Sequence, residues 1–535
     1  MLGGDVRGLP GISAASFHGS RPFNRLLTLV LVIVGAYEAA SYILAGDMVG
    51  LGYVAVACIV CVFVLSMLND WRRGLYILLI WLMFEDLVRK YLGNNMAIYF
   101  AKDVLAAVVY LSYFLAWRRK QLEGFRAPFL PIVLVFVWFG FLQVFNPASP
   151  HLVYGLLGMK LFFYYIPLML VGYALVDSEK ELQRFFLINL IPIVFIAALG
   201  IAQAIVGPTF LNPAVIQEDI RELSSLYRVA PISGAIVYRP TSVFVSTGRY
   251  GDLLNISSLL GLGFLAYTLL RYQKGRRLAF ISVSMITAGI LLCGSRGAFV
   301  WGLINTVVVG IAFFWGAPWR AQEVVRILRA IFRVCLGITL AIAALFFLFP
   351  DSLKGRLAVY EETLSPDSPA SELTHRVRDY PLRNFMGAFD YDNWVYGYGI
   401  GTTTLGVQYV TRIFGVRPVV GGVESGFGAL VVEMGIGGLV LWVLMGLWIT
   451  VSAWKVVLRL RGSPWFPIGF VIGWFAFLML FPHMIGGMQS YEDFILNAYF
   501  WLLLGILFRL PHIKASTEQA VIEKTLTQPQ QRWIT

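Results

Sequence analysis

Residues 187–207 read LINLIPIVFIAALGIAQAIVG, an apolar run without a single charged side chain. A helix needs roughly 20 apolar residues to cross the hydrocarbon core of a bilayer, so this run is long enough to span a membrane. Similar runs recur along the chain, in which 58% of the 535 residues are hydrophobic and only 13% are charged. Typical soluble domains are about 25% charged. The sequence therefore predicts an all-α polytopic membrane protein and excludes a soluble enzyme, a disordered chain and a fibrous protein.

The apolar runs divide into about 14 candidate membrane spans. The run at 75–92 is the least regular of them because four charged residues interrupt it. The fourteen ranges are 26–44, 48–68, 75–92, 98–117, 129–145, 153–176, 187–207, 251–270, 279–294, 297–315, 334–349, 427–449, 464–482 and 494–508.

The distribution of basic residues predicts how these spans are oriented. With the N-terminus in the cytoplasm, the six cytoplasmic loops carry 19 Lys and Arg residues, and the four short external loops carry none. Cytoplasmic loops are enriched in Lys and Arg, and four basic residues near external span ends do not outweigh this difference. We therefore predict a cytoplasmic tail at 1–25, a transmembrane domain at 26–508 and a flexible cytoplasmic tail at 509–535.

Two predicted external loops, 208–250 and 350–426, are too long to be simple connectors, and long loops in compact folds are usually functional. Arginine strongly outnumbers lysine in both loops. The planar guanidinium of arginine can hold a phosphate or carboxylate through two parallel hydrogen bonds. Because external positive charge runs against the usual bias, we expect these loops to bind an anionic substrate.

Arg296 is the sharpest single candidate. It lies in the stretch Gly294-Ser295-Arg296-Gly297-Ala298, between two apolar runs. Arginine at membrane depth is costly and usually faces a cavity or a partner. Ser295 can cap the following helix, whose N-terminus would itself attract an anion. The alternative interpretation is a helix-end arginine whose side chain reaches the lipid headgroups.

Two other patterns favour structural interpretations. Asp390-Tyr391-Asp392 spells D-x-D, which we interpret as an acidic turn and not as a metal site. The cysteines lie in or at the ends of apolar runs, and they have neither a second C-x-x-C pair nor a nearby histidine. We therefore expect small core residues, no metal and no cofactor; the four are Cys58, Cys61, Cys293 and Cys335.

The segment Gly294–Ala298 also resembles the Ser-Arg-Gly-Ala signature of the O-antigen ligase and Wzy-type O-antigen and exopolysaccharide polymerase superfamily. Three further stretches are similar to the family's motifs in the same order. These are Tyr238–Phe244, then Arg376–Tyr380 with the Gly-x-Gly-x-Gly turn at Gly397–Gly401, and finally Glu424–Gly438. The resemblance covers residues 238–440. It departs from the family's pattern at Ser242, where that pattern has glycine, and at Glu424, where the ligases have histidine.

The resemblance implies a GT-C-like glycosyltransferase of the bacterial inner membrane, whose active site faces the periplasm. Its donor and acceptor would be undecaprenyl-diphosphate-linked oligosaccharides, and transfer would be inverting and independent of metal. The implied partners are membrane lipid and a chain-length regulator or export protein, and nucleic acid is not among them. Glu424 would be the general base. The residues expected to bind the diphosphate are Arg296, Arg239, Arg376, Arg378 and Arg249.

Three functions remain open at this point. We prefer a polysaccharide polymerase, because the external loop is large and aromatic and because the ligase-type histidine is replaced. The first alternative is an O-antigen ligase that transfers glycan to a lipid A-core acceptor. The second, from another class of protein, is a lipid-linked glycan transporter or flippase. Many transporters contain an inverted pair of broken spans, and we find no such pair in this sequence.

Overall fold

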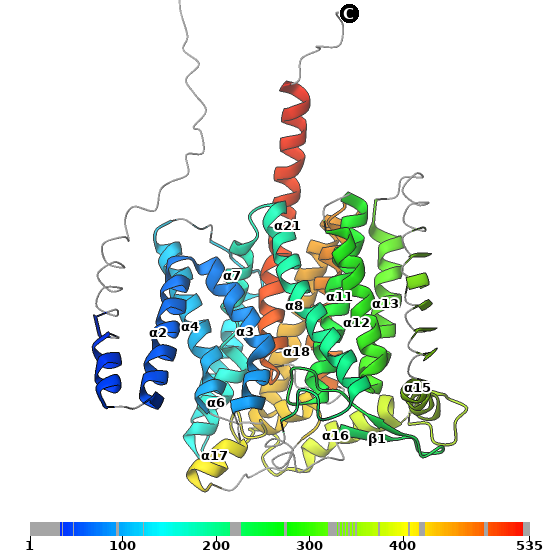
Figure 1. Cartoon of the computed structure of the whole chain (residues 1–535), viewed down its shortest axis with the longest axis horizontal. Coiled ribbons are helices and arrows are strands. Elements are labelled where there is room, and N and C mark those ends of the chain that lie inside the picture. The colour runs from blue at the N-terminus through cyan, green and yellow to red at the C-terminus, as the bar shows by residue number, and fades with distance from the viewer. Residues whose placement is uncertain are drawn as a thin grey trace, which may run out of the picture. The chain divides into compact units, whose positions relative to one another are not determined.

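The computed structural model describes most of the chain (Figure 1). The described ranges are 33–34, 36–45, 48–92, 96–120, 122, 124–213, 226–271, 275–318, 350–372, 375–404, 407–416, 423–485 and 491–527, with scattered residues between 329 and 347. The tail predicted at 1–25 and residues 214–225 and 417–422 lie outside these ranges, as do parts of the predicted spans 26–44 and 334–349.

The chain forms two compact units. The smaller consists of Met1–Leu75 and Val104–Leu115, and the larger consists of Tyr76–Asp103 and Ala116–Thr535. In the smaller unit, the Ser112 hydroxyl donates to the Leu68 carbonyl at 3.2 Å, and the ring of Trp71 packs edge-on against Tyr113. Helix α2 (Met48–Asn69) belongs to the smaller unit, whereas α3 (Trp71–Leu92) and α4 (Met96–Arg118) contribute residues to both.

The larger unit is a helical bundle. Its most buried long helix is α11, which packs against α8, α12, α13 and α19. The helices of the bundle are α5 (Leu130–Val144), α6 (Leu152–Phe163), α7 (Leu168–Leu175), α8 (Glu179–Val206), α11 (Thr247–Arg271), α12 (Arg276–Leu292), α13 (Arg296–Gly316), α18 (Gly426–Leu460), α19 (Phe466–Leu480), α20 (Pro482–Ile485) and α21 (Phe494–Thr527).

The predicted fold class is confirmed in its general form. Eight helices in the described residues are long and apolar enough to cross a membrane, and the only strands there form one short hairpin. The chain is therefore an all-helical membrane protein. The count of fourteen spans stays a prediction. The predicted span at 153–176 corresponds to one apolar segment, Leu152–Leu175, in which a short turn separates α6 from α7. The predicted tail at 509–535 begins as helix, because α21 continues to Thr527.

Serine caps start three of the long helices. The hydroxyls of Ser178, Ser295 and Ser425 each accept a hydrogen bond from the backbone amide three residues later, at 3.2–3.4 Å. Such caps satisfy amide groups that have no partner within the helix. The structure thus confirms the predicted cap at Ser295, which fixes where Arg296 enters the bundle.

The two predicted external loops fold into short elements at one end of the larger unit (Figure 1). The first contains a hairpin of β1 (Tyr227–Val229) and β2 (Ile236–Tyr238), in which Arg228 pairs with Val237. The second contains α15 (Pro350–Leu364), the π-helical turn η1 (His375–Asp379), α16 (Tyr380–Met386), the 3-10 turn η2 (Gly387–Asp390) and α17 (Val407–Phe414).

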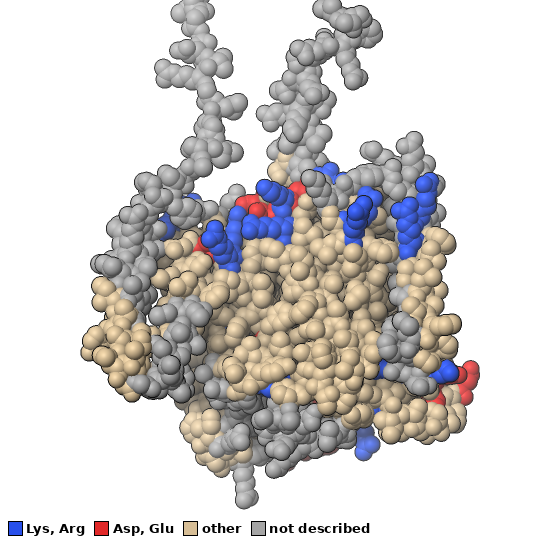
Figure 2. All heavy atoms as spheres, in the orientation of Figure 1, with Lys and Arg blue, Asp and Glu red and all other residues tan. Residues whose placement is uncertain are grey.

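The opposite end of the larger unit carries much of its basic charge. Figure 2 shows Lys and Arg side chains gathered along that end of the visible face, above a broad band without charge. Arg271 ends α11 and Arg276 begins α12 at this end. The orientation predicted from these basic residues, with this end in the cytoplasm, stays a prediction.

Candidate functional site

Two predicted arginines come together where α12 turns into α13. Arg296 is the first residue of α13, and Arg239 follows β2. Gly294 lies between the helices at φ 64°, and a Cβ there would lie 3.0 Å from Cγ of Arg239. The side chain of Arg239 therefore lies against the turn that carries Arg296.

The two guanidinium groups are close enough to affect each other. Burial lowers the pKa of Arg239 below its ordinary value, and the nearby Arg296 cation acts in the same direction. Two cations beside a helix N-terminus create an electropositive site, because the first amides of the helix also point toward that end. Such an arrangement suits a phosphate group or a carboxylate.

Glu372 supplies a carboxylate to this site. Its Oε1 lies 2.8 Å from Nη1 of Arg296, and the side chains are 38% and 13% exposed, respectively. This pair could not be predicted from the sequence, because Glu372 belongs to a loop more than seventy positions away. The ion pair shows that the Arg296 guanidinium can hold an oxyanion in this position.

Arg356 on α15 holds the site together. Its side chain is only 3% exposed, and it donates to the carbonyls of Leu292 at 2.9 Å and Tyr238 at 3.0 Å. These bonds join α15 to the last turn of α12 and to the end of β2. The neighbouring Tyr360 hydroxyl donates to the carbonyl of Leu291 at 3.2 Å. Arg356 thus positions the backbone that leads to Arg239, a role that sequence reasoning had not assigned.

The stretch after Arg239 is fastened by buried polar groups. The ammonium of Lys90 on α3 donates to the Thr241 hydroxyl at 2.8 Å and to the Ser242 carbonyl at 2.7 Å. The Gln203 side-chain oxygen accepts from the amides of both residues. Ser242 has φ 51°, a left-handed conformation that glycine adopts most easily. The structure therefore explains why a glycine would suit this position, while the Ser242 hydroxyl gains a hydrogen bond to Ile196 at 2.7 Å.

Arg249 lies in a different environment from Arg239 and Arg296. Its Nη1 lies 2.9 Å from Oδ2 of Asp86, and its Nε lies 3.9 Å from Oδ2 of Asp493. The guanidinium also packs over the ring of Phe494. Its charge is balanced within the bundle, so the structure favours a structural role for Arg249 over the predicted diphosphate contact.

The remaining predicted residues lie on the second loop. Arg378 is exposed in η1, and the side chain of Arg376 is outside the described part of the chain. Glu424 is exposed and directly precedes the Ser425 cap of α18. It forms no hydrogen bond and no ion pair with any described residue, so its carboxylate is open to solvent or substrate.

The start of α18 is connected to α13 through α20. A Cβ at Gly426 would lie 2.8 Å from Sδ of Met484 on α20, and the next residue toward the N-terminus, His483, packs its ring against Trp301 of α13. Trp301 lies five positions after Arg296, a rise of about 7.5 Å along the helix. The same short helix thus touches the segment after Glu424 and the helix that begins with Arg296.

Two of the family-like motifs pack directly on each other. The amides of Tyr398 and Gly399 donate to the carbonyls of Val432 and Glu433 at 2.8 and 2.9 Å. Gly435 interrupts α18 with φ 69°, which lets the turn approach the helix backbone. The Glu433 carboxylate accepts from the amide and hydroxyl of Thr403 at 3.0 and 2.6 Å. The glycine turn at Gly397–Gly401 is therefore packed against the backbone of α18 and has a structural role.

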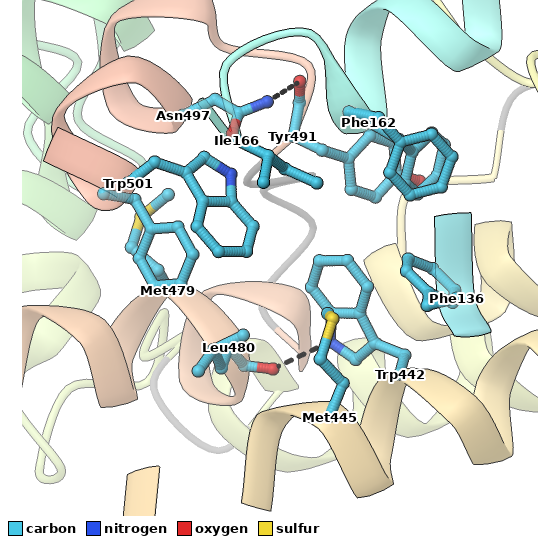
Figure 3. Close-up of a pocket in the computed structure, with 12 residues that line it drawn as sticks. Phe136, Phe162, Ile166, Trp442, Met445, Met479, Leu480, Tyr491, Asn497 and Trp501 are labelled. Atoms are coloured by element: carbon cyan, nitrogen blue, oxygen red, sulfur yellow. Dashed lines mark hydrogen bonds between the residues drawn. The ribbon is translucent and has the colours of Figure 1, made fainter. Parts of the chain in front are cut away.

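A cavity of about 20 Å³ lies among α5, α6, α18, α19 and α21 (Figure 3). Its walls are mostly aromatic and apolar, and two of them, the rings of Trp442 and Tyr491, meet edge-on with centroids 6.0 Å apart. This volume is about that of one water molecule. Its apolar walls offer few partners to an anion, so we place the candidate site at the two arginines.

Asp390 is the last residue of η2, Asp392 follows two positions later, and both are exposed. Within the described residues, no group of three or more His, Cys, Asp or Glu side chains is arranged to hold a metal ion.

Comparison with known proteins identifies no relative, so the evidence for function comes from the residues of this chain. No protein-family model matches the sequence, and no curated protein matches it significantly.

Proposed function

We propose that this protein is a membrane glycosyltransferase that polymerises oligosaccharide repeat units carried on a polyprenyl diphosphate. The reaction would take place on the periplasmic face of a bacterial inner membrane. A lipid-linked donor brings its own activated sugar, so no nucleotide is needed on that face. The motif resemblance at residues 238–440 supports this reaction class.

The observation that carries the proposal is the Arg239–Arg296 pair at the start of α13. A diphosphate leaving group has several oxygens, and two guanidinium forks match that geometry. Charge on the diphosphate increases as the glycosidic bond breaks. Fixed cations that favour this charge lower the barrier to transfer. The buried links made by Arg356 keep the backbone near Arg239 in place before substrate binds.

Glu424 is the proposed general base. Its carboxylate removes the proton from a hydroxyl of the acceptor glycan, and that oxygen bonds to the anomeric carbon of the donor. The bond from this carbon to the diphosphate oxygen breaks, and the diphosphate leaves with the electron pair. One displacement of this kind inverts the configuration at the anomeric carbon. Arg378, exposed in η1, is available to contact the substrate as well.

A ligase that uses the same donor remains the first alternative, and only the acceptor would differ. One observation favours a transporter as a second candidate. Two ion pairs with little exposure, Glu85–Lys102 at 2.8 Å and Asp103–Lys160 at 2.6 Å, link α3, α4 and α6. Charged residues inside a membrane domain often mark transport pathways.

The test is polymerisation by purified protein in liposomes supplied with a defined lipid-linked repeat unit. Wild type should make long glycan, and Arg296→Lys and Arg296→Ala should both abolish it, because lysine keeps the charge but loses the fork. Arg383→Ala is the matched control, since Arg383 is an exposed arginine on α16 outside the pair. Near-normal polymer from Arg296→Ala would refute the proposed site. Movement of the unchanged lipid across the bilayer without polymer would identify a transporter.

A further inference from the structure

We propose that Lys90 on α3 is a positioning residue of the diphosphate site, which acts by holding the backbone that carries Arg239. This inference rests on the proposed function and deepens it, because it adds a residue from outside the two long loops to the arginine site. Lys90 does not touch the substrate in this role. It determines where the Arg239 side chain lies before the diphosphate binds.

The ammonium of Lys90 is buried without a counterion. Lys90 is only 2% exposed, and no carboxylate of the described residues lies within 4.0 Å of its nitrogen. The acceptors that it contacts are neutral, namely the Thr241 hydroxyl at 2.8 Å and the Ser242 carbonyl at 2.7 Å. A buried cation is unfavourable in a membrane domain and is a functional candidate by default. Here the cation holds one short stretch of backbone.

This stretch is joined rigidly to Arg239. Pro240 lies between Arg239 and Thr241, and its ring fixes one of its own backbone dihedrals and restricts the residue before it to extended conformations. On the other side, the Arg239 amide donates to the Leu226 carbonyl at 2.7 Å. The backbone of Arg239 is therefore held at both ends, and a displacement at Thr241 is passed on to Arg239.

The clamp on this stretch also supports an unfavourable backbone conformation. The amides of Thr241 and Ser242 donate to the Gln203 side chain on α8 at 2.8 and 2.7 Å. Ser242 has φ 51°, a conformation that persists only when the surrounding structure enforces it. Without Lys90, Ser242 can relax to an ordinary conformation, and the Arg239 side chain then occupies several orientations.

The expected size of the effect follows from this loss of order. A site whose binding-competent arrangement is only partly populated binds its ligand more weakly by that fraction. Hydrogen bonds to a charged group favour one arrangement by about 10- to 150-fold. If Lys90 serves only the stability of the bundle, its loss would lower the melting temperature and leave the affinity of the folded protein unchanged.

The experiment is a double-mutant cycle with Arg239, measured as equilibrium binding of polyprenyl diphosphate to detergent-solubilised full-length protein. Lys90→Met removes the ammonium and should weaken binding by about 10-fold or more. It should have no further effect when combined with Arg239→Ala, because a residue that acts through Arg239 then has nothing to position. Arg271→Met is the control, since it breaks a partly buried ion pair with Glu179 at the other end of the bundle and should bind as wild type.

Thr241→Val is the second variant, and it decides the question if Lys90→Met fails to fold. It removes one acceptor of Lys90 but keeps the cation, so it separates positioning from a simple effect of charge. We expect it to weaken binding by about 3- to 10-fold, and again to have no effect beside Arg239→Ala.

Each result separates the two proposals. Wild-type affinity in Thr241→Val, or in a folded Lys90→Met, overturns the role of Lys90. An equal loss of affinity with and without Arg239 also overturns it, because that result identifies a general effect of charge or packing. If Arg239→Ala itself binds as wild type does, the proposed diphosphate site fails, and the positioning role fails with it.

Discussion

Because Arg296 and Glu372 form an ion pair, we predict that substitutions of the two residues change diphosphate affinity in opposite directions. If Arg296 binds diphosphate, Glu372 competes with that ligand in the unliganded protein. Removing the arginine should then weaken diphosphate binding, and removing the carboxylate should strengthen it. If the pair serves only to fasten the loop, both substitutions should cause the same small loss of stability and leave binding unchanged.

The structure sets the size of each effect. Glu372 is 38% exposed, so solvent screens the pair and its contribution is about 0.2–1 kcal/mol. Glu372→Gln should therefore raise diphosphate affinity by up to about 5-fold. Arg296 is only 13% exposed, and it would lose charge-assisted bonds worth about 2–4 kcal/mol. Arg296→Ala should lower affinity by about 30- to 1000-fold.

The assay is equilibrium binding of polyprenyl diphosphate to the purified protein, measured at low and high salt. The gain in Glu372→Gln should shrink as salt rises, because screening weakens the competing pair in wild type. Glu361→Gln removes an exposed carboxylate from α15 and serves as the control. Weaker binding by Glu372→Gln, or no change in Arg296→Ala, would refute the reasoning.

Three further predictions concern the base, the orientation and the glycine turn. Glu424→Gln should lower the rate of transfer by about 10²–10⁴-fold, and Glu424→His should keep some activity that falls as pH drops through about 6.5, because only neutral imidazole accepts a proton; full turnover by the Gln variant would exclude the base. Cysteines placed at Ser368 and Ser516 should differ in reaction with an impermeant thiol reagent on spheroplasts, with labelling at Ser368 only; the reverse pattern would overturn the orientation. Gly401→Ala should cost about 2–5 kcal/mol, since a Cβ would collide with the Tyr154 carbonyl and φ is 88°; an unchanged melting temperature would contradict this packing.

The general fold was predictable because few backbone structures are stable inside a lipid bilayer. Long apolar runs must form helices there, since every backbone amide needs a partner inside the segment. The break between α12 and α13 also follows from sequence, because Gly294 and Ser295 interrupt the run. The turn between α6 and α7 leaves no signal in the hydropathy, because the apolar character continues through it. Hydropathy measures burial, and it does not report a local change in backbone conformation.

The site was predictable in part, and for different reasons. Arg296 stood out because a charged residue at membrane depth requires an explanation. Arg249 was expected to bind the diphosphate as well, yet its partner Asp86 is more than a hundred and fifty positions away and could not be paired with it from one sequence. Arg356 donates its hydrogen bonds to backbone carbonyls. Because every residue has a backbone carbonyl, the sequence contains no pattern that would identify these partners. Local motifs therefore located the arginine pair, and tertiary contacts determined which cations were already neutralised.

The buried glycine turn bears on how the protein is assembled in the membrane. Gly399 packs near Gln143 and Ser149, and the same turn hydrogen-bonds to Glu433 on α18. Its contacts therefore join segments that are synthesised far apart in time, and the turn cannot close until α18 has entered the bilayer. Non-local contacts of this kind form late, since the chain between them must be ordered first. Defects in this turn should leave an incompletely closed protein, which membrane proteases would degrade.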